Sequence, residues 1–222
     1  MIYGDKIWEK LFASKEWGKY PPEEVIRYYF FVSNQLGEKN IKALDIGSGK
    51  GACSWFLKKG CAEVTAFEGA PAGLKSTNKV ALEFNVKDKI FLLHGDITEP
   101  KNYINSKFDL LLDNYALYSN EENKIKRALV EYYDLTAQSG FFLMNCFGEK
   151  TTGFGSGKQL SDNTWIDISN GIMKERGIVT WFTKKSLFDI FQKIGFSISY
   201  YENILIERNQ NIIEKHSICL KK

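Results

Sequence analysis

The sequence alternates short apolar runs with stretches of helical periodicity over most of its length, from about Ile41 to Gly195. Five runs have the length and composition of strands, and each ends at a polar or glycine-rich bend; they span residues 41–46, 63–67, 90–94, 108–113 and 141–146. Parallel neighbours in a sheet need a crossover connection, which is usually a helix. The alternation therefore predicts an α/β fold with a mostly parallel sheet and helices on its faces.

Helix and turn signals surround these runs. Residues 121–137 place apolar side chains on one helical face, and Thr183 is expected to cap a second amphipathic helix that ends at Gly195. Ahead of the first strand, residues 21–24 (PPEE) are typical of a helix start. The segment 197–220 is strand-like on both sides of a polar turn, which predicts a closing antiparallel hairpin.

The bulk composition is that of one globular domain, which we expect to span residues 1–222. Of the 222 residues 44% are apolar, enough to build a single hydrophobic core. The 30 basic and 27 acidic residues are interspersed without a basic arm, so charge does not indicate a nucleic-acid partner. The first residues lack an apolar signal segment, and no run of about eighteen apolar residues occurs, so no membrane association is expected.

Cysteine usage fits a reducing compartment. Cys53, Cys61, Cys146 and Cys219 lie far apart and include no CxxC pair, so neither a zinc site nor a disulfide framework is indicated. A cytoplasmic location is therefore expected.

The most informative motif is the bend DIGSGKG at residues 45–51, between the first predicted strand and a predicted helix. Its glycines tolerate positive φ and let a ligand approach the backbone closely. Gly47, Gly49 and Ala52 also satisfy the looser dinucleotide-binding fingerprint GxGxxA. By itself, the bend does not distinguish between nucleotide-containing ligands, and a loop that binds nothing is the plainest alternative.

Two further acids lie at later strand ends. Glu68 ends the second predicted strand, about twenty residues after the first glycine, where a carboxylate can accept hydrogen bonds from both hydroxyls of a ribose. Asp96 follows the third strand, where its carboxylate can accept a hydrogen bond from an adenine amino group. Asp45 at the bend would repel a pyrophosphate but attract an ammonium or sulfonium group. Together the three acids favour a cationic adenosine-containing ligand, although each alone is also compatible with a solvated loop or a helix cap.

The runs ALDIGSGKG, FEG, HGDI and FDLLLDNYALYS, in this order and at these spacings, resemble the class I S-adenosylmethionine-dependent methyltransferases of the small-molecule type, over roughly residues 17–201. The resemblance implies a Rossmann-like three-layer αβα sandwich whose seven-stranded, mostly parallel sheet has one antiparallel strand near the C-terminus. It also implies S-adenosyl-L-methionine as cofactor and S-adenosyl-L-homocysteine as product. The cofactor-binding residues that it implies are Asp45, Gly47, Ser48, Gly49, Glu68, Gly69, Asp96, Ile97, Asp113 and Tyr20.

Two segments lie outside the regular alternation. Residues 1–40 are expected to form an N-terminal lid and helix, since residues 17–21 (WGKYP) resemble the lid of many small-molecule members of this family. Residues 148–180 are richer in Gly, Thr and Ser and are expected to be a substrate-side insertion. Trp165 within it and Trp181 directly after it can either wall the acceptor pocket or anchor the insertion to the core.

Methyl transfer is a direct displacement at a sulfonium carbon, so the protein mainly aligns the reactants and excludes water. Near the end of the fourth strand, Asp113, Tyr115 and Tyr118 are the candidate catalytic residues, as a base or as walls of the acceptor cavity. His94 and His216 are expected to have structural roles. The acids and amides at the strand ends are too few to infer a metal.

The sequence therefore predicts a methyltransferase that acts on an oxygen or nitrogen atom of a small molecule, for example a sugar or another polar metabolite. A monomer or homodimer is expected. Two alternatives stay open: an NAD-dependent oxidoreductase that uses the same glycine bend, and a non-catalytic module that binds S-adenosylmethionine.

Overall fold

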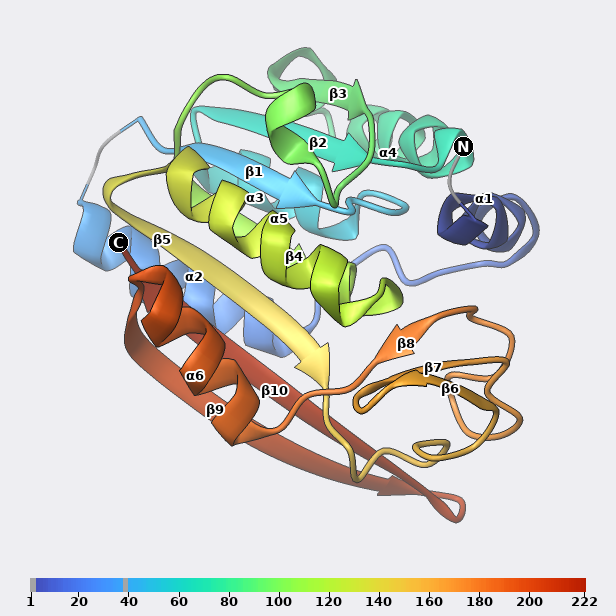
Figure 1. Ribbon diagram of the computed structural model, residues 1–222. Helices are drawn as coiled ribbons and strands as arrows, with labels where there is room; N and C mark the ends of the chain where they lie inside the picture. The colour runs from blue at the N-terminus through green and yellow to red at the C-terminus, as the bar shows by residue number, and fades with distance from the viewer. Residues whose placement is uncertain (1–2, 38–39) are drawn as a thin grey trace.

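A computed structural model describes residues 3–37 and 40–222 (Figure 1). Its seven-stranded sheet has the order β3-β2-β1-β4-β5-β10-β9. The strands are β1 (Lys42–Ile46), β2 (Glu63–Glu68), β3 (Ile90–His94), β4 (Phe108–Asn114), β5 (Thr136–Phe147), β9 (Ser197–Arg208) and β10 (Asn211–Lys221). β10 runs antiparallel to both of its neighbours, whereas the remaining pairs are parallel. The predicted sheet with one reversed strand is confirmed.

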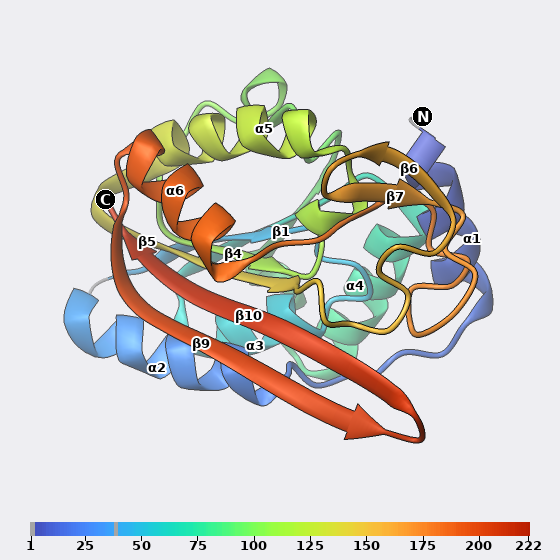
Figure 2. The same cartoon turned by 60° about the horizontal axis from the view of Figure 1, so that its bottom comes forward.

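Helices cover both faces of this sheet (Figures 1 and 2). α2 (Glu23–Leu36), α3 (Ala52–Gly60) and α4 (Pro71–Glu83) pack on one face, and α5 (Glu122–Leu135) and α6 (Lys184–Ile194) pack on the other. Short 3₁₀ turns lie at Lys87–Lys89, Pro100–Asn102 and Leu117–Ser119. The three layers are the αβα sandwich that the sequence predicts.

Alternating strand residues supply the two cores. In β1, Leu44 and Ile46 belong to the core beneath α5 and α6, whereas Ala43 belongs to the core beneath α2 and α3. β4 repeats this arrangement with Leu111 on one face and Leu110 on the other. Because both faces of the sheet are covered, its central strands are almost continuously apolar, and this is why the sequence reveals them.

The junction between α5 and β5 differs from the prediction. The expected helix over 121–137 ends at Leu135, and β5 begins at Thr136. Thr136 pairs with Phe108 of β4, and its hydroxyl donates to the carbonyl oxygen of Tyr132 at 2.7 Å. Pairing with β4 and this side-chain hydrogen bond therefore end the helix early.

The predictions for the C-terminal part are confirmed. Thr183 caps α6 with a capping box, in which its Oγ1 accepts the Ser186 N–H and its own N–H donates to the Ser186 hydroxyl, both at 3.0 Å. Gly195 ends the helix with a φ of 111°. The β9–β10 hairpin turns at Asn209 and Gln210, whose φ values of 46° and 66° are those of a tight two-residue turn.

Two peripheral segments lie beside the sheet. α1 (Tyr3–Ser14) packs next to α4, where Glu9 accepts the Ala72 N–H at 2.7 Å. After β5, the chain forms a separate three-stranded sheet of β6 (Lys158–Ser161), β7 (Thr164–Ile166) and β8 (Val179–Thr180). Positions 1–2 and 38–39 of the predicted N-terminal segment 1–40 lie outside the described residues.

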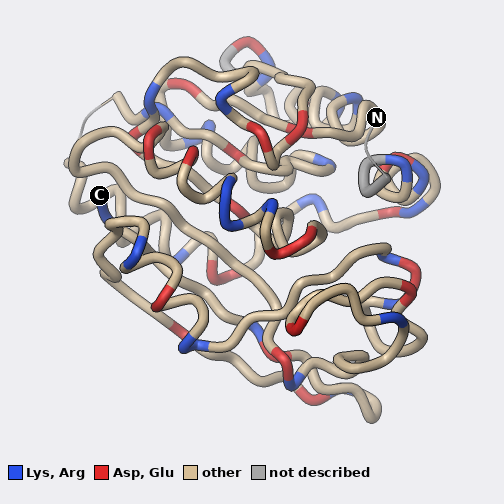
Figure 3. Tube along the Cα trace, in the orientation of Figure 1, with Lys and Arg blue, Asp and Glu red and all other residues tan. Residues whose placement is uncertain are grey.

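Charged residues of both signs are spread along the chain (Figure 3). Among the helices within residues 3–37 and 40–222, none has the length and apolar character that crossing a membrane requires. The four cysteines are free and buried, so their thiols act as small apolar groups of the core.

We expect Thr183→Ala to lower the free energy of unfolding by about 1 kcal/mol, because the first turn of α6 loses the hydroxyl that accepts the Ser186 N–H. Urea denaturation followed by circular dichroism measures the change. Thr183→Ser keeps the hydroxyl and is the matched control. If the Ala and Ser variants proved equally stable, the cap would contribute nothing.

Candidate functional site

The glycine bend between β1 and α3 forms the floor of the candidate site. The N–H groups of Gly47 and Ser48 both donate to the Phe67 carbonyl oxygen, at 2.8 and 3.2 Å, so the bend is attached to the end of β2. Gly47 has a φ of 63°, and a Cβ there would lie 2.2 Å from the Cβ of Ala116 in the loop after β4. Glycine is therefore required for these two strand-end loops to approach each other.

Asp45 lies beneath this bend and is 1% exposed. The Ser54 hydroxyl donates to its Oδ2 at 2.5 Å. Burial, together with the nearby negative charge of Glu68, raises the pKa of Asp45 to about 7 against the opposing effect of the Ser54 hydrogen bond. A cation bound beside Asp45 would favour its ionised form, so this position suits a positively charged ligand group.

Glu68, at the end of β2, connects the bend to the start of α4. Its Oε2 accepts the Gly49 N–H at 2.8 Å, and its Oε1 accepts the Ala70 N–H at 2.9 Å. An ionised carboxylate can accept about four hydrogen bonds. A carboxylate held in this way can therefore also accept hydrogen bonds from ligand hydroxyls.

The loop after β3 is held by local hydrogen bonds. Oδ1 of Asp96 accepts both the N–H and the hydroxyl of Thr98, each at 2.8 Å. Nε2 of His94 lies 3.0 Å from the Gly69 carbonyl oxygen and so links the ends of β2 and β3. This contact orients the loop and is a structural role of the kind expected for His94.

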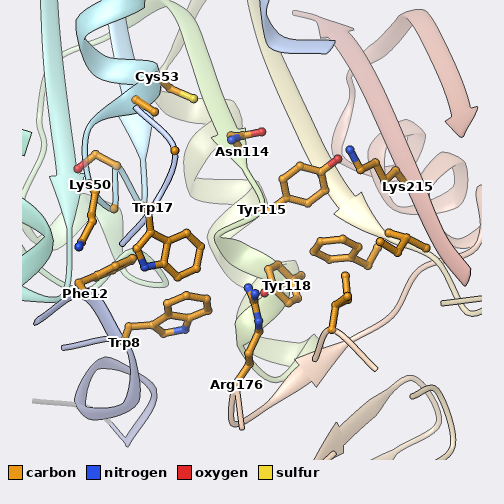
Figure 4. Close-up of a pocket in the computed structure, with 18 of the residues that line it drawn as sticks. Trp8, Phe12, Trp17, Lys50, Cys53, Asn114, Tyr115, Tyr118, Arg176 and Lys215 are labelled. Atoms are coloured by element: carbon orange, nitrogen blue, oxygen red, sulfur yellow. The ribbon is translucent and has the colours of Figure 1, made fainter. Parts of the chain in front are cut away.

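Two cavities meet at the carboxyl edge of the sheet. The larger has a volume of about 410 Å³ and is shown in Figure 4, and the smaller has about 60 Å³. Trp8, Phe12, Gly47 and Tyr115 line both, so the cavities are adjacent. Of the predicted site residues, the larger cavity is lined by Asp45, Gly47, Ser48, Gly49, Tyr115 and Tyr118, and the smaller by Gly47, Glu68, Gly69, Asp96, Ile97 and Tyr115.

Tyr115 stands between the two cavities in an unusual backbone conformation. Its φ of 60° is rare for a bulky residue, and its N–H donates to the Asn145 carbonyl oxygen at 3.1 Å. Its ring stacks on Phe147 with centroids 4.6 Å apart, and its buried hydroxyl has no hydrogen-bond partner among the described residues. Burial raises the pKa of Tyr115 well above its usual range, so the phenol stays protonated and can donate a hydrogen bond.

Asp113, a candidate base and cofactor ligand in the sequence, lines neither cavity. It is completely buried, and its Oδ1 accepts the N–H groups of Ala116 and Leu117 at 2.8 and 3.3 Å. Burial raises its pKa to about 7 against the effect of these two hydrogen bonds. The structure places Asp113 beneath the turn that carries Tyr115, so it positions that turn.

The N-terminal residues that line the site do not include Tyr20, which the sequence predicts there. Tyr20 is 69% exposed, packs its ring against Trp55 and lines neither cavity. Trp8 and Phe12 of α1, together with Trp17, line the larger cavity instead. Trp8 and Phe12 are one helical turn apart, and this aromatic pair is the signal by which the sequence could have revealed them.

The insertion contributes Ile172 and Arg176 to the larger cavity. Trp181 is fully buried in the core and Trp165 packs against that core, so these two rings anchor the insertion instead of walling the cavity. Sequence reasoning missed Arg176, because a single basic residue in an irregular segment has no spacing that marks it.

His216 lies in the hairpin and lines neither cavity. Its Nδ1 is 2.8 Å from the Tyr201 hydroxyl and its Nε2 is 3.0 Å from the Phe182 carbonyl oxygen. Burial lowers its pKa, which keeps the ring neutral in this structural role. Within the part of the chain that the structure describes, no group of three or more His, Cys, Asp and Glu side chains could hold a metal ion.

Residues 44–144 match the model of a protein family described as a methyltransferase domain. The matched segment runs from β1 into β5 and includes the glycine bend, the strand-end acids and the Tyr115 turn. A search by sequence among curated proteins finds no match.

Solved structures with the same fold include methyltransferases and one enzyme of another kind. The N-methyltransferase NodS from Bradyrhizobium japonicum, in complex with S-adenosyl-L-homocysteine, has a TM-score of 0.67 at 14% identity, over 100% of this chain and 99% of that one. The 1,6-didemethyltoxoflavin-N1-methyltransferase from Burkholderia thailandensis has 0.65 at 14%, over 98% and 88%. The (4+2)-cyclase SpnF has 0.65 at 12%, over 88% and 80%. At these identities the likeness shows the fold.

The sheet with its single reversed strand, and the site at the carboxyl ends of its central strands, are those of the Rossmann-like fold of class I methyltransferases. The central segment of the chain, residues 44–144, matches the methyltransferase-domain family. The resemblance indicated by the sequence motifs is thereby confirmed.

We expect Asp113→Asn to gain stability relative to the wild type as the pH rises from about 5 to 8. The folded-state pKa of about 7 lies above the model value of 3.8, so in this range the wild type loses a proton that favours its folded state, whereas Asn stays neutral. Urea denaturation at several pH values measures the difference. Asp162→Asn, at an exposed loop position, is the control. A stability difference that did not change with pH would contradict the expected titration.

Proposed function

We propose that this protein transfers a methyl group from S-adenosyl-L-methionine to an oxygen or nitrogen atom of a small molecule and releases S-adenosyl-L-homocysteine. The observation that carries the proposal is the placement of Asp45, Glu68 and Asp96 at or just after the ends of three neighbouring strands, around one glycine bend. Three carboxylates beside one ligand site suit a cation better than an anion. The adjoining cavity of about 410 Å³ has the size of a small-molecule site.

The residues present fit this cofactor. Asp45 and the backbone of the bend would hold its methionine end, Glu68 its ribose hydroxyls, and Asp96 with Ile97 its adenine. A Cβ at Gly49 would lie 3.3 Å from the Phe12 ring, so the missing side chain keeps a narrow space open beside the bend.

When bound, the cofactor supplies a sulfonium methyl carbon that the acceptor attacks directly. The protein's contribution is alignment and the exclusion of water. α1 and the insertion meet beside the cavity, where the guanidinium carbon of Arg176 lies 5.8 Å from the ring centroid of Trp8 and 5.4 Å from that of Trp17. We infer that the insertion and the N-terminal segment together enclose the acceptor.

The acceptor must bind with its attacking lone pair already unprotonated, because no described side chain of the larger cavity serves as its general base. Among the described residues that line the larger cavity, Asp45 is the only carboxylate and there is no histidine. Asp45 is assigned to the cofactor, and the buried Tyr115 phenol stays protonated. Tyr115 therefore serves as a hydrogen-bond donor that positions the acceptor, and Tyr118 serves as a wall. An unprotonated amine or an ionised oxygen satisfies this site.

Two alternatives predict different ligands or reactions. An NAD-dependent oxidoreductase would place a pyrophosphate at the bend, directly above Asp45, where two like charges repel. A protein that binds the cofactor without transferring its methyl group is the second alternative. SpnF, a cyclase with this fold, illustrates that the fold does not determine the reaction.

Isothermal titration calorimetry with S-adenosylhomocysteine and with NAD tests the cofactor. We expect S-adenosylhomocysteine to bind and NAD not to bind, and the reverse result would overturn the proposal. Transfer of a labelled methyl group to members of a small-molecule panel then tests catalysis. Cofactor binding without any transfer would favour the non-catalytic module.

We expect Glu68→Ala to weaken S-adenosylhomocysteine binding by about 1.5–3 kcal/mol, the typical contribution of charge-assisted hydrogen bonds. Calorimetry measures the loss, and Glu68→Gln, which keeps one acceptor oxygen, should retain part of the affinity. Thermal melting must show that both variants fold, because Glu68 also accepts the Gly49 and Ala70 N–H groups. Unchanged affinity would remove Glu68 from the site.

A further inference from the structure

The larger cavity has an uneven distribution of charge. Apart from Asp45, the charged residues that line it are all basic: Lys50, Arg176, Arg208 and Lys215. They come from the bend, the insertion, β9 and β10, so proximity in sequence does not account for their gathering. Figure 4 shows Arg176 and Lys215 reaching into the cavity from different sides, with Tyr115 and Tyr118 between them.

Two of these four cations already have polar partners. Nζ of Lys215 lies 2.9 Å from Oε1 of Glu24, and Nζ of Lys50 donates to the Lys15 carbonyl oxygen at 2.5 Å. Arg176 and Arg208 form no salt bridge with any acid in the described part of the chain. Within residues 3–37 and 40–222, no salt bridge therefore neutralises the positive charge of these two arginines.

Arg176 is held in place by aromatic rings. Its guanidinium lies over Trp8 and Trp17, at 5.8 and 5.4 Å from their centroids. Ring faces stabilise a cation but leave the N–H groups at the guanidinium edge available. A guanidinium edge matches the geometry of a carboxylate or phosphate group, to which it can donate two parallel hydrogen bonds.

Aromatic rings form the wall next to these cations. Tyr115 stacks on Phe147 with an interplanar angle of 30°, and Tyr118 meets Phe147 edge-on with centroids 5.0 Å apart. Within the described residues the Tyr115 hydroxyl has no hydrogen-bond partner. Such a wall suits a planar, largely apolar body with one polar contact at the phenol.

We propose that the methyl acceptor is a small organic oxyanion, with a planar apolar body and a carboxylate or phosphate group that binds Arg176 and Arg208. This inference rests on the proposed function and narrows its acceptor class. A neutral acceptor, such as the sugar considered from the sequence, would leave both arginines without an anionic partner. An oxyanion neutralises them and is oriented by them.

The test uses protein saturated with S-adenosylhomocysteine and matched pairs of ligands. Calorimetry compares hydroxybenzoates and aminobenzoates with the corresponding benzamides, and aryl phosphates with the corresponding phenols. The contributions of a carboxylate and of a phosphate group are thereby measured separately. We expect at least one acid to bind roughly tenfold or more tightly than its neutral partner.

Arg176→Gln and Arg208→Gln should each weaken binding of that acid by roughly tenfold to a hundredfold and leave binding of the neutral partner unaffected. Lys174→Gln, an exposed residue of the same segment that does not line the cavity, is the matched control.

The outcomes separate this inference from the proposed function. Failure of the wild type to bind S-adenosylhomocysteine would overturn the proposed function itself. If the wild type binds S-adenosylhomocysteine but binds no acid, or binds acids no better than their neutral partners, only the anionic acceptor is overturned. Because Arg176 also packs on α1, Arg208→Gln decides the question should Arg176→Gln lose S-adenosylhomocysteine binding.

Discussion

The parallel pairing of β1 with β2 on one side and with β4 on the other is the constraint on which the site depends. In this register Ile46 lies opposite both Phe67 and Asp113, so the three strands end at the same level. The strand order also reverses between β1 and β4, and loops that leave such a point diverge and open a crevice at the carboxyl ends of the strands. The glycine bend and the Tyr115 turn face this crevice because of that topology.

Burial of carboxylates at this edge gives the site its electrostatic character. Asp45 and Asp113 both have pKa values raised to about 7, mainly because burial disfavours the charged form. Across the larger cavity, Arg176 and Arg208 present positive charge that no described acid neutralises. The site therefore has an acidic part suited to a cationic cofactor and a basic part suited to the proposed anionic acceptor, and two ligands of opposite charge would attract each other across it.

The cavity is completed by segments from distant parts of the chain. Trp8 comes from the N-terminal helix, Arg176 from the insertion after β5 and Lys215 from the C-terminal hairpin. These additions surround a sheet that this chain shares with NodS and with a cyclase. Because proteins with this sheet catalyse different reactions, the sheet alone does not determine the acceptor, and we propose that the added segments select it.

By itself the sequence determined the sheet, the glycine bend and the strand-end acids, since apolar periodicity and residue spacing along the chain encode them. Only the tertiary structure decided which residues face the cavity. Asp113 and Tyr115 are near neighbours in sequence, yet the turn at Tyr115 directs its ring into the cavity and leaves Asp113 buried beneath. Trp8 and Arg176 meet although they are far apart in sequence. Such contacts arise from packing of the whole chain, and no local pattern encodes them.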